Sequence, residues 1–175
     1  MRWLVDGYNV IRRAPELKSR ERESLEAGRQ ALCMLLVEVA RRSDDTFTVV
    51  FDGVQAGGRA GGGSGVTVIF SSARESADHV LSRMAREGGA VVSNDREVRR
   101  AAKRAGAVVV TTDQFLSRLD EVGAARPEVS ADEKDGDGDE APSGPRTGNP
   151  RRISKKDRAT RRALGRLNPD RRSRS

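Results

Sequence analysis

The first ten residues read MRWLVDGYNV, and the short apolar run at residues 2–5 stops abruptly at Asp6-Gly7. Similar runs recur along the chain, at residues 46–51 (TFTVVF), 66–70 (VTVIF), 107–111 (AVVVT) and, more weakly, 90–93 (AVVS). Nearly continuous runs that are rich in β-branched residues are typical of strands buried on both faces of a parallel sheet. We therefore expect a buried parallel strand near the start of the chain, ending at a carboxylate.

Helical patterns alternate with these strands. In the longest, over residues 21–42, apolar side chains recur on one stripe at helical spacing, at Leu25, Leu32, Leu36 and Val39. Shorter patterns predict helices over residues 75–87 and 95–105 and a last helix that begins at Thr112-Asp113. Alternating strands and helices predict an α/β fold, with a doubly wound, mostly parallel sheet of about five strands within residues 1–127.

The positive charge of the chain, +7 overall, is concentrated at its C-terminal end, where residues 141–175 hold twelve basic and two acidic side chains. Residues 128–150 are acidic and rich in glycine and proline, which predicts a disordered linker. Residues 151–175 are expected to be a solvated, disordered basic tail that binds nucleic acid through its charge. A transient helix there could form on its large apolar residues, Ile153, Leu164 and Leu167. We expect the domain to fold without these two segments.

Composition excludes several classes of protein. No apolar run approaches the length of a membrane span, and the chain reaches Asp6 before any signal-peptide core could form. Cys33 is the only cysteine and His79 the only histidine, which excludes an internal disulfide and a zinc site built on cysteines or on several histidines. We therefore expect a soluble, cytoplasmic protein with no membrane partner.

Residues 53–65 (GVQAGGRAGGGSG) contain seven glycines. A phosphate-binding loop of the Walker type would end in Gly-Lys-Ser/Thr, and a dinucleotide-binding loop would directly follow the first strand. Neither condition holds here, so we expect a flexible surface loop between two strands.

Acidic residues follow predicted strands at four places: Asp6, Asp52, Asp95 and Asp113. Two more, Glu75 and Asp78, lie three residues apart in the first turn of a predicted helix. The carboxyl ends of parallel strands meet at one edge of the sheet, where doubly wound folds bind their ligands. Carboxylates gathered there repel one another unless a cation lies between them, and an all-oxygen ligand set selects Mg²⁺ or Mn²⁺.

Helix N-termini favour acidic residues even where no metal binds. That alternative accounts well for Asp113 and Glu75, and in part for Asp95. It accounts poorly for Asp6 and Asp52, because each of them precedes a glycine in a predicted loop. A metal site is therefore best supported at Asp6.

Short motifs along the chain resemble those of one nuclease family. VDGYNV at residues 5–10 resembles the opening motif of the NYN domains, a branch of the PIN-like nucleases. The match extends to VFDG at residues 50–53, to ESAD at 75–78 and to VSND at 92–95, with Glu97 shortly after. The spacing is most similar to that of the YacP-like subgroup, and the resemblance covers roughly residues 1–120.

The resemblance implies a PIN-like fold and a metal-dependent endoribonuclease that cleaves single-stranded RNA. Asp6, Asp78 and Asp95 match the acidic centre of the family, and Asp52 would be a further ligand of Mg²⁺ or Mn²⁺. Asn9 would lie at the same edge, where its amide orients an acid or contacts a phosphate.

Glu75 and Asp113 match the family pattern less closely. YacP-like proteins are associated with cleavage of mRNA, in part at the ribosome, so RNA and the ribosome are the partners that the resemblance implies. Two other readings stay open: a non-catalytic RNA- or ribosome-binding protein of the same fold, and a phosphatase. The phosphatase ranks low, because Asp6 is followed by Gly-Tyr rather than completing the DxD pattern of one large phosphatase class.

Basic side chains outside the acidic centre are candidates for contact with RNA. They lie on the predicted helix at residues 95–105 and in the tail: Arg96, Arg99, Arg100, Lys103, Arg151, Arg152, Lys155, Lys156, Arg161 and Arg162. Ordinary solvated charges are the alternative interpretation. Tyr8 could stack on a base, although RNA recognition usually uses more than one aromatic residue.

Overall fold

The structure, a computed structural model, describes residues 1–53, 59–60, 63–72, 74–124 and 154–167. Its strands are β1 (Arg2–Asp6), β2 (Thr46–Phe51), β3 (Arg59–Ala60), β4 (Val66–Phe70), β5 (Ala90–Val92) and β6 (Val108–Val110). Its helices are α1 (Gly7–Arg13), α2 (Pro15–Glu23), α3 (Leu25–Arg42), α4 (Ala77–Ala85), α5 (Arg96–Arg104), α6 (Thr112–Ala124) and α7 (Lys155–Arg166). The predicted linker at residues 128–150 and most of the glycine-rich loop lie outside the described residues.

Five of the described strands are parallel and form the sheet that the sequence predicts. The order across the sheet is β3-β4-β2-β1-β5-β6, and the short β3 pairs antiparallel with β4 at one edge. In β1, Asp6 is level with Val50 of β2, and Val5 is level with Val92 of β5. The chain leaves β1 towards β2 and returns on the other side of β1 to form β5, so the topology reverses between β1 and β5. The prediction of a doubly wound α/β fold is confirmed.

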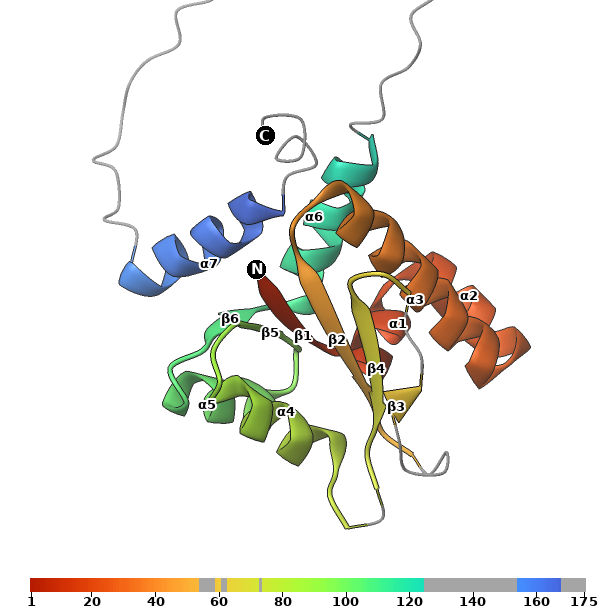
Figure 1. Cartoon of the computed structure of the whole chain (residues 1–175), viewed down its shortest axis with the longest axis horizontal. Coiled ribbons are helices and arrows are strands. Elements are labelled where there is room, and N and C mark those ends of the chain that lie inside the picture. The colour runs from red at the N-terminus through yellow and green to blue at the C-terminus, as the bar shows by residue number, and fades with distance from the viewer. Residues whose placement is uncertain (54–58, 61–62, 73, 125–153, 168–175) are drawn as a thin grey trace, which may run out of the picture.

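Helices cover both faces of this sheet (Figure 1). The larger core cluster lies on the face covered by α1, α3, α6 and α7, and it contains the contacting rings of Trp3, Phe47 and Phe115, whose centroids are 5.5 to 6.5 Å apart. The second cluster lies under α4 and α5 and includes Leu4 and Val91. The central strand is thus buried on both faces, which fixes its last residue at the edge of the sheet. None of the described helices combines the length and apolarity needed to cross a bilayer.

Two helices that we did not predict, α1 and α2, fill the connection between β1 and α3. Helix α1 begins at the residue after β1 because the side chain of Asp6 accepts a backbone N–H of its first turn. Pro15 starts α2, and the side chain of Ser24 caps α3. Gly7 is required at the sharp start of α1, because a Cβ there would overlap the ring of Phe51.

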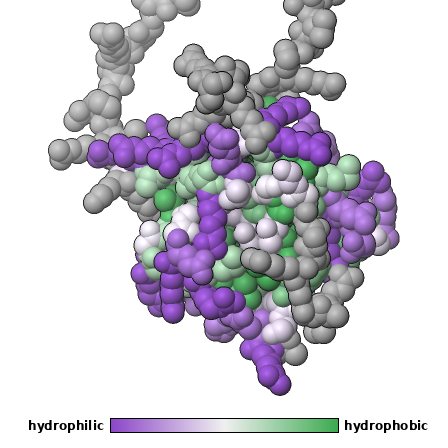
Figure 2. Space-filling view, viewed as in Figure 1, coloured by the Kyte–Doolittle hydropathy of each residue, from purple (hydrophilic) through white to green (hydrophobic). Residues whose placement is uncertain are grey.

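Helix α7 differs from our expectation of a solvated tail, because it packs against β6 and α6 (Figure 1). Ala163 and Leu167 are buried in the larger core cluster, and the Thr160 hydroxyl donates to the carbonyl oxygen of Val109 at 3.1 Å. The Arg118 side chain on α6 donates to the carbonyl oxygen of Leu167 at 2.8 Å. A narrow apolar stripe cannot hold a short helix in water, but the surface of β6 and α6 supplies the missing partner. The outward side of α7 is hydrophilic (Figure 2).

We expect Leu167→Ala to lower the free energy of unfolding by about 2–5 kcal/mol, the usual range for truncating a buried leucine. Leu167 is fully buried, so the substitution leaves a cavity between α7 and the domain. Denaturant unfolding of the full chain measures the change, with Arg162→Ala on the exposed side of α7 as the matched control. An unchanged stability in L167A would show that α7 does not pack on the domain in solution. From the sequence we expected residues 1–127 to fold without the tail. The packing of α7 predicts that this shorter domain is less stable than the full chain.

Candidate active site

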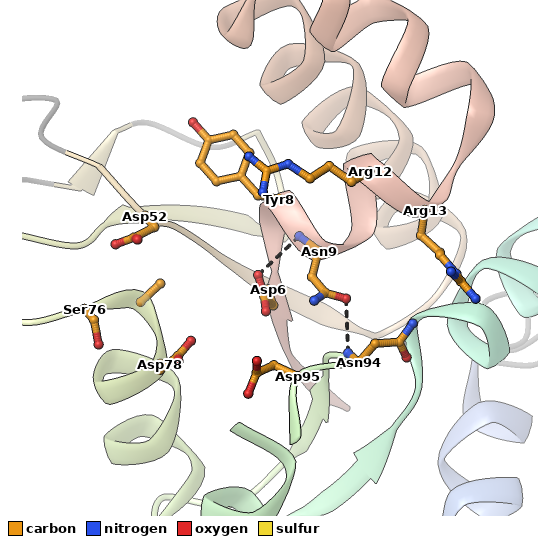
Figure 3. Close-up of a pocket in the computed structure, with 11 residues that line it drawn as sticks. Asp6, Tyr8, Asn9, Arg12, Arg13, Asp52, Ser76, Asp78, Asn94 and Asp95 are labelled. Carbon is orange, nitrogen blue, oxygen red and sulfur yellow. Dashed lines mark hydrogen bonds between the residues drawn. The ribbon is translucent and has the colours of Figure 1, made fainter. Parts of the chain in front are cut away.

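A cavity of about 570 Å³ opens at the carboxyl end of the sheet, beside the reversal of topology between β1 and β5. Doubly wound folds bind ligands at such points, because the loops that leave the two neighbouring strands diverge there. The end of β1, helix α1, the residue after β2, the start of α4 and the loop after β5 all contribute to its lining (Figure 3). The structure brings four of the predicted carboxylates to this cavity: Asp6, Asp52, Asp78 and Asp95.

Asp6 is tied to both sides of the reversal point. Its Oδ1 accepts the backbone N–H of Asn9 at 3.3 Å, and its Oδ2 accepts the hydroxyl of Ser93, after β5, at 2.9 Å. Burial raises the pKa of Asp6 above its ordinary value of 3.8, the two hydrogen bonds partly offset that rise, and the charges of Asp78 and Asp95 add to it. A nearby cation would relieve both the burial cost and the repulsion.

Asp95 and Asp52 are held by hydrogen bonds of their own. Asp95 caps α5, where its Oδ1 accepts the backbone N–H of Glu97 at 2.7 Å and that of Val98 at 3.1 Å. Oδ1 of Asp52 accepts the hydroxyl of Ser71 at 2.6 Å. Because an ionised carboxylate has about four acceptor positions, both residues keep the capacity to bind a cation.

Asp78 lies in the first turn of α4 and faces Asp95 across the cavity (Figure 3). Partial burial raises its pKa, and the charges of Asp95 and Asp52 raise it further. His79 lowers the pKa of Asp78, and Glu97 raises it slightly. The ionised form of Asp78 is therefore disfavoured, in part, by the other acids of the same cavity.

Asn9 is fixed by a network of uncharged hydrogen bonds. Its Oδ1 accepts the backbone N–H of Asn94 at 3.1 Å and the hydroxyl of Thr112 at 2.8 Å. Oδ1 of Asn94 in turn accepts the backbone N–H of Thr112 at 3.0 Å. Because the oxygen of Asn9 is used in this network, its amide NH₂ group is the part that can act in the cavity, and that group is a donor.

Glu75 and Asp113, the two other acidic candidates, do not line this cavity, and each of them is paired with an arginine. Glu75 forms an ion pair with Arg83 at 3.1 Å, and Asp113 forms one with Arg13 at 2.7 Å. The guanidinium hydrogen bonds hold the pKa of both carboxyls below their ordinary values. A carboxylate that an arginine already neutralises does not require a metal cation, so these two acids are poor candidates for ligands.

The cavity suits Mg²⁺ or Mn²⁺ by the chemistry of its donors, and it is not a closed cage. Within the described part of the chain, no three Asp, Glu, His or Cys side chains lie close enough to hold one ion together. Mg²⁺ keeps several waters and usually binds through one or two carboxylates together with substrate phosphates. The carboxylates around Asp6 offer only oxygen ligands, and their charges repel one another. They can therefore supply the one or two carboxylates that such an ion needs.

The sequence did not predict the part that Arg12, Arg13 and Ser93 play at the cavity. Arg12 and Arg13 line it from α1, and their placement depends on a helix that the apolar pattern did not indicate. The hydroxyl of Ser93 donates to Asp6 and accepts the backbone N–H of Asp95 at 3.0 Å. The sequence Ser93-Asn94-Asp95 after a predicted strand indicates a turn. Its serine can be assigned to Asp6 only once β1 and β5 are known to be neighbours in the sheet.

Of the basic residues that we predicted to contact RNA, those within the described part of the chain lie on two helices. Helix α5 begins beside the cavity, with Arg96, Arg100 and Lys103 exposed and Arg99 partly buried. Helix α7 exposes Arg161 and Arg162, and it includes positions 155 and 156. Arg151 and Arg152 lie outside the described residues.

The domain that contains the cavity is similar to a known protein family and to solved structures. The family model of the YacP-like NYN domain matches residues 3–144. A crystal structure of a mutant of Rae1 (YacP) from Bacillus subtilis is similar, with a TM-score of 0.61 and 26% identity over 70% of this chain and 77% of that chain. A second crystal structure of Rae1 (YacP) gives a TM-score of 0.61 and 25% identity over 71% of this chain and 76% of that chain. No curated protein sequence matches the chain.

We expect Asp78→Asn to raise the melting temperature of the metal-free protein at neutral pH. The pKa of Asp78 is raised on folding, so the folded state is penalised when this carboxyl is ionised. The penalty is absent at pH values well below 3.8, where the group is protonated in both states, and it grows as the pH rises through the native pKa.

Thermal melts in EDTA across this pH range measure the effect, with Asp120→Asn on the exposed side of α6 as a control of equal charge change. A lower melting temperature for D78N than for D120N at neutral pH would contradict the electrostatic description of the cavity.

Proposed function

Because the chain belongs to the YacP-like NYN domain family, a family of PIN-like nucleases, we propose that it is a metal-dependent endoribonuclease that cleaves single-stranded RNA. The observation that carries the proposal is the convergence of four carboxylates, from three strand ends and one helix, on a single cavity at the reversal point of the sheet. Two of them, Asp6 and Asp78, have pKa values raised in part by the charges of the others. A bound cation removes that repulsion.

In this proposal the ion binds directly to Asp6 and to one of Asp78 and Asp95, and the remaining acids, Asp52 included, contact the waters of the ion. The ion would supply a water of lowered pKa and a Lewis acid for in-line displacement at the phosphodiester. The Ser93 hydroxyl donates to Asp6 and accepts the backbone N–H of Asp95, so it fixes the position of one acid relative to the other. Ser93 is therefore a positioning residue. The amide NH₂ of Asn9 donates to a phosphate oxygen or to one of the acids.

We propose mRNA as the substrate and the ribosome as a partner, on the resemblance to the YacP-like subgroup and on the charge of the chain. The acids of the cavity repel phosphate until a cation is bound, so attraction of RNA must come from elsewhere. Exposed arginines and a lysine on α5 and α7 can supply it, since each neutralised phosphate releases counterions.

Incubation of the purified full-length protein with labelled single-stranded RNA is expected to give cleavage in Mn²⁺ or Mg²⁺ and none in EDTA. Asp6→Asn should lower kcat/KM by about 10³-fold or more, because loss of metal-assisted stabilisation costs several kcal/mol in the transition state. Asp120→Asn, with the same charge change away from the cavity, is expected to keep the activity of the wild type.

Cleavage that persists in EDTA, or that is undiminished in D6N, would refute the metal mechanism. Binding of RNA with a steep salt dependence, but without cleavage in any divalent metal, would favour the alternative of a non-catalytic RNA- or ribosome-binding protein.

A further inference from the structure

Helix α1 gives the cavity a wall whose chemistry differs from that of the carboxylates (Figure 3). Among the described residues that line the cavity, Tyr8 is the aromatic one, and Arg12 and Arg13 are the basic ones. Tyr8 and Arg12 are four residues apart in the helix, so they lie on one face of it. The function proposed above uses none of these three side chains.

The ring of Tyr8 is held rigidly from behind. It packs edge-on against Phe51, with 5.2 Å between the ring centroids. Its hydroxyl accepts hydrogen bonds from Nε of Arg29, at 2.9 Å, and from Nη2 of the same side chain. Arg29 is itself only 14% exposed and lies over the rings of Phe51 and Phe70. A ring that is already ordered loses little entropy when a ligand packs on it.

Arg12 places an exposed cation over this ring. Its guanidinium carbon lies 5.2 Å from the centre of the Tyr8 ring, and its side chain is 65% exposed. The ion pair of Arg12 is with Glu21, a partly buried carboxylate, and it is long, at 3.5 Å, so it holds the exposed guanidinium less firmly than a short pair would. Arg13, in contrast, is engaged by Asp113 at 2.7 Å. Arg12 is therefore the cation of this wall that can turn towards a phosphate.

An ordered ring beside a movable guanidinium is suited to a single-stranded nucleotide. Unpaired bases stack on aromatic rings, and a guanidinium binds phosphate oxygens in a fork-like geometry. A base inside a duplex does not offer its face to such a ring. Every base has a π-face, so a stacking platform of this kind tolerates any sequence.

We propose that Tyr8 and Arg12 form a subsite for one unpaired nucleotide next to the scissile phosphate. The guanidinium of Arg12, which lies over the Tyr8 ring in this structure, turns to the adjoining phosphate of the backbone, and the base stacks on the ring in its place. This inference rests on the proposed function, because the carboxylates across the cavity define where the scissile phosphate lies. The subsite gives the cavity its selectivity for single strands.

The test compares two ligands of equal length and charge, a short single-stranded RNA and an abasic ribose-phosphate oligomer, bound to the full-length protein in EDTA. The wild type is expected to bind the RNA about 5- to 150-fold more tightly, the gain for one stacked base. Tyr8→Leu should lose most of this preference, and Tyr8→Phe, which keeps the ring, should retain it.

Arg12→Gln should weaken the binding of both oligomers and reduce the salt dependence by about one phosphate contact. Arg22→Gln, which removes an exposed arginine of α2, is the matched control and should leave both affinities unchanged. Thermal melts of each variant establish that it is folded before its affinities are compared.

A Tyr8→Leu protein that keeps the full preference for RNA, or a wild type that has none, overturns the subsite. Cleavage of the same RNA by the wild type in Mn²⁺ keeps the two proposals apart. If the wild type cleaves the RNA and its preference for RNA over the abasic oligomer does not depend on Tyr8, the subsite is refuted and the nuclease proposal stands. A Tyr8-dependent preference without cleavage supports the subsite and refutes the nuclease. A wild type that neither binds nor cleaves RNA refutes both.

Discussion

The hydrogen bond from the Ser93 hydroxyl to Oδ2 of Asp6 joins the end of β1 to the loop after β5, and the geometry of the cavity depends on it. Burial disfavours the ionised form of Asp6, and this bond, with the one from the backbone of Asn9, is what opposes that effect. The same hydroxyl accepts the backbone N–H of Asp95. One buried serine thus sets the relation between two carboxylates that come from different strands, 89 residues apart in the sequence.

Arginine pairing divides the acids of this edge into two groups. Glu75 and Asp113 each have a guanidinium partner, and their pKa values are lowered. Asp6 and Asp78 face other acids, and their pKa values are raised. The acids of this edge that lack an arginine partner therefore lie in one cavity, where we propose that the cation binds. Arg12 and Arg13 of α1 line the same cavity, but their ion pairs are with Glu21 and Asp113 rather than with its four carboxylates.

The sequence predicts the parallel strands well, because continuous β-branched apolar runs form strands in any sheet that is covered on both faces. Strands β2 and β4, for example, have the predicted bounds. The gathering of Asp6, Asp52 and Asp95 followed from strand ends alone. Helix α1 was not predicted, because it has only seven residues and because the closeness of the Phe51 ring, which requires glycine at position 7, exists only in the folded sheet. The packing of helix α7 on the domain was not predicted either, because its apolar side chains need β6 and α6 as partners, and these are placed only in the folded protein.

The central claim is that the carboxylates around Asp6 share a divalent cation. The most direct measurement is a crystal structure of the full-length protein with Mn²⁺, with anomalous data collected at the manganese absorption edge. The account predicts an anomalous peak at coordination distance, about 2.0–2.3 Å, from oxygens of Asp6 and of at least one of Asp78 and Asp95. An absence of any peak at saturating Mn²⁺, or a peak confined to Glu75 or Asp113, would contradict it.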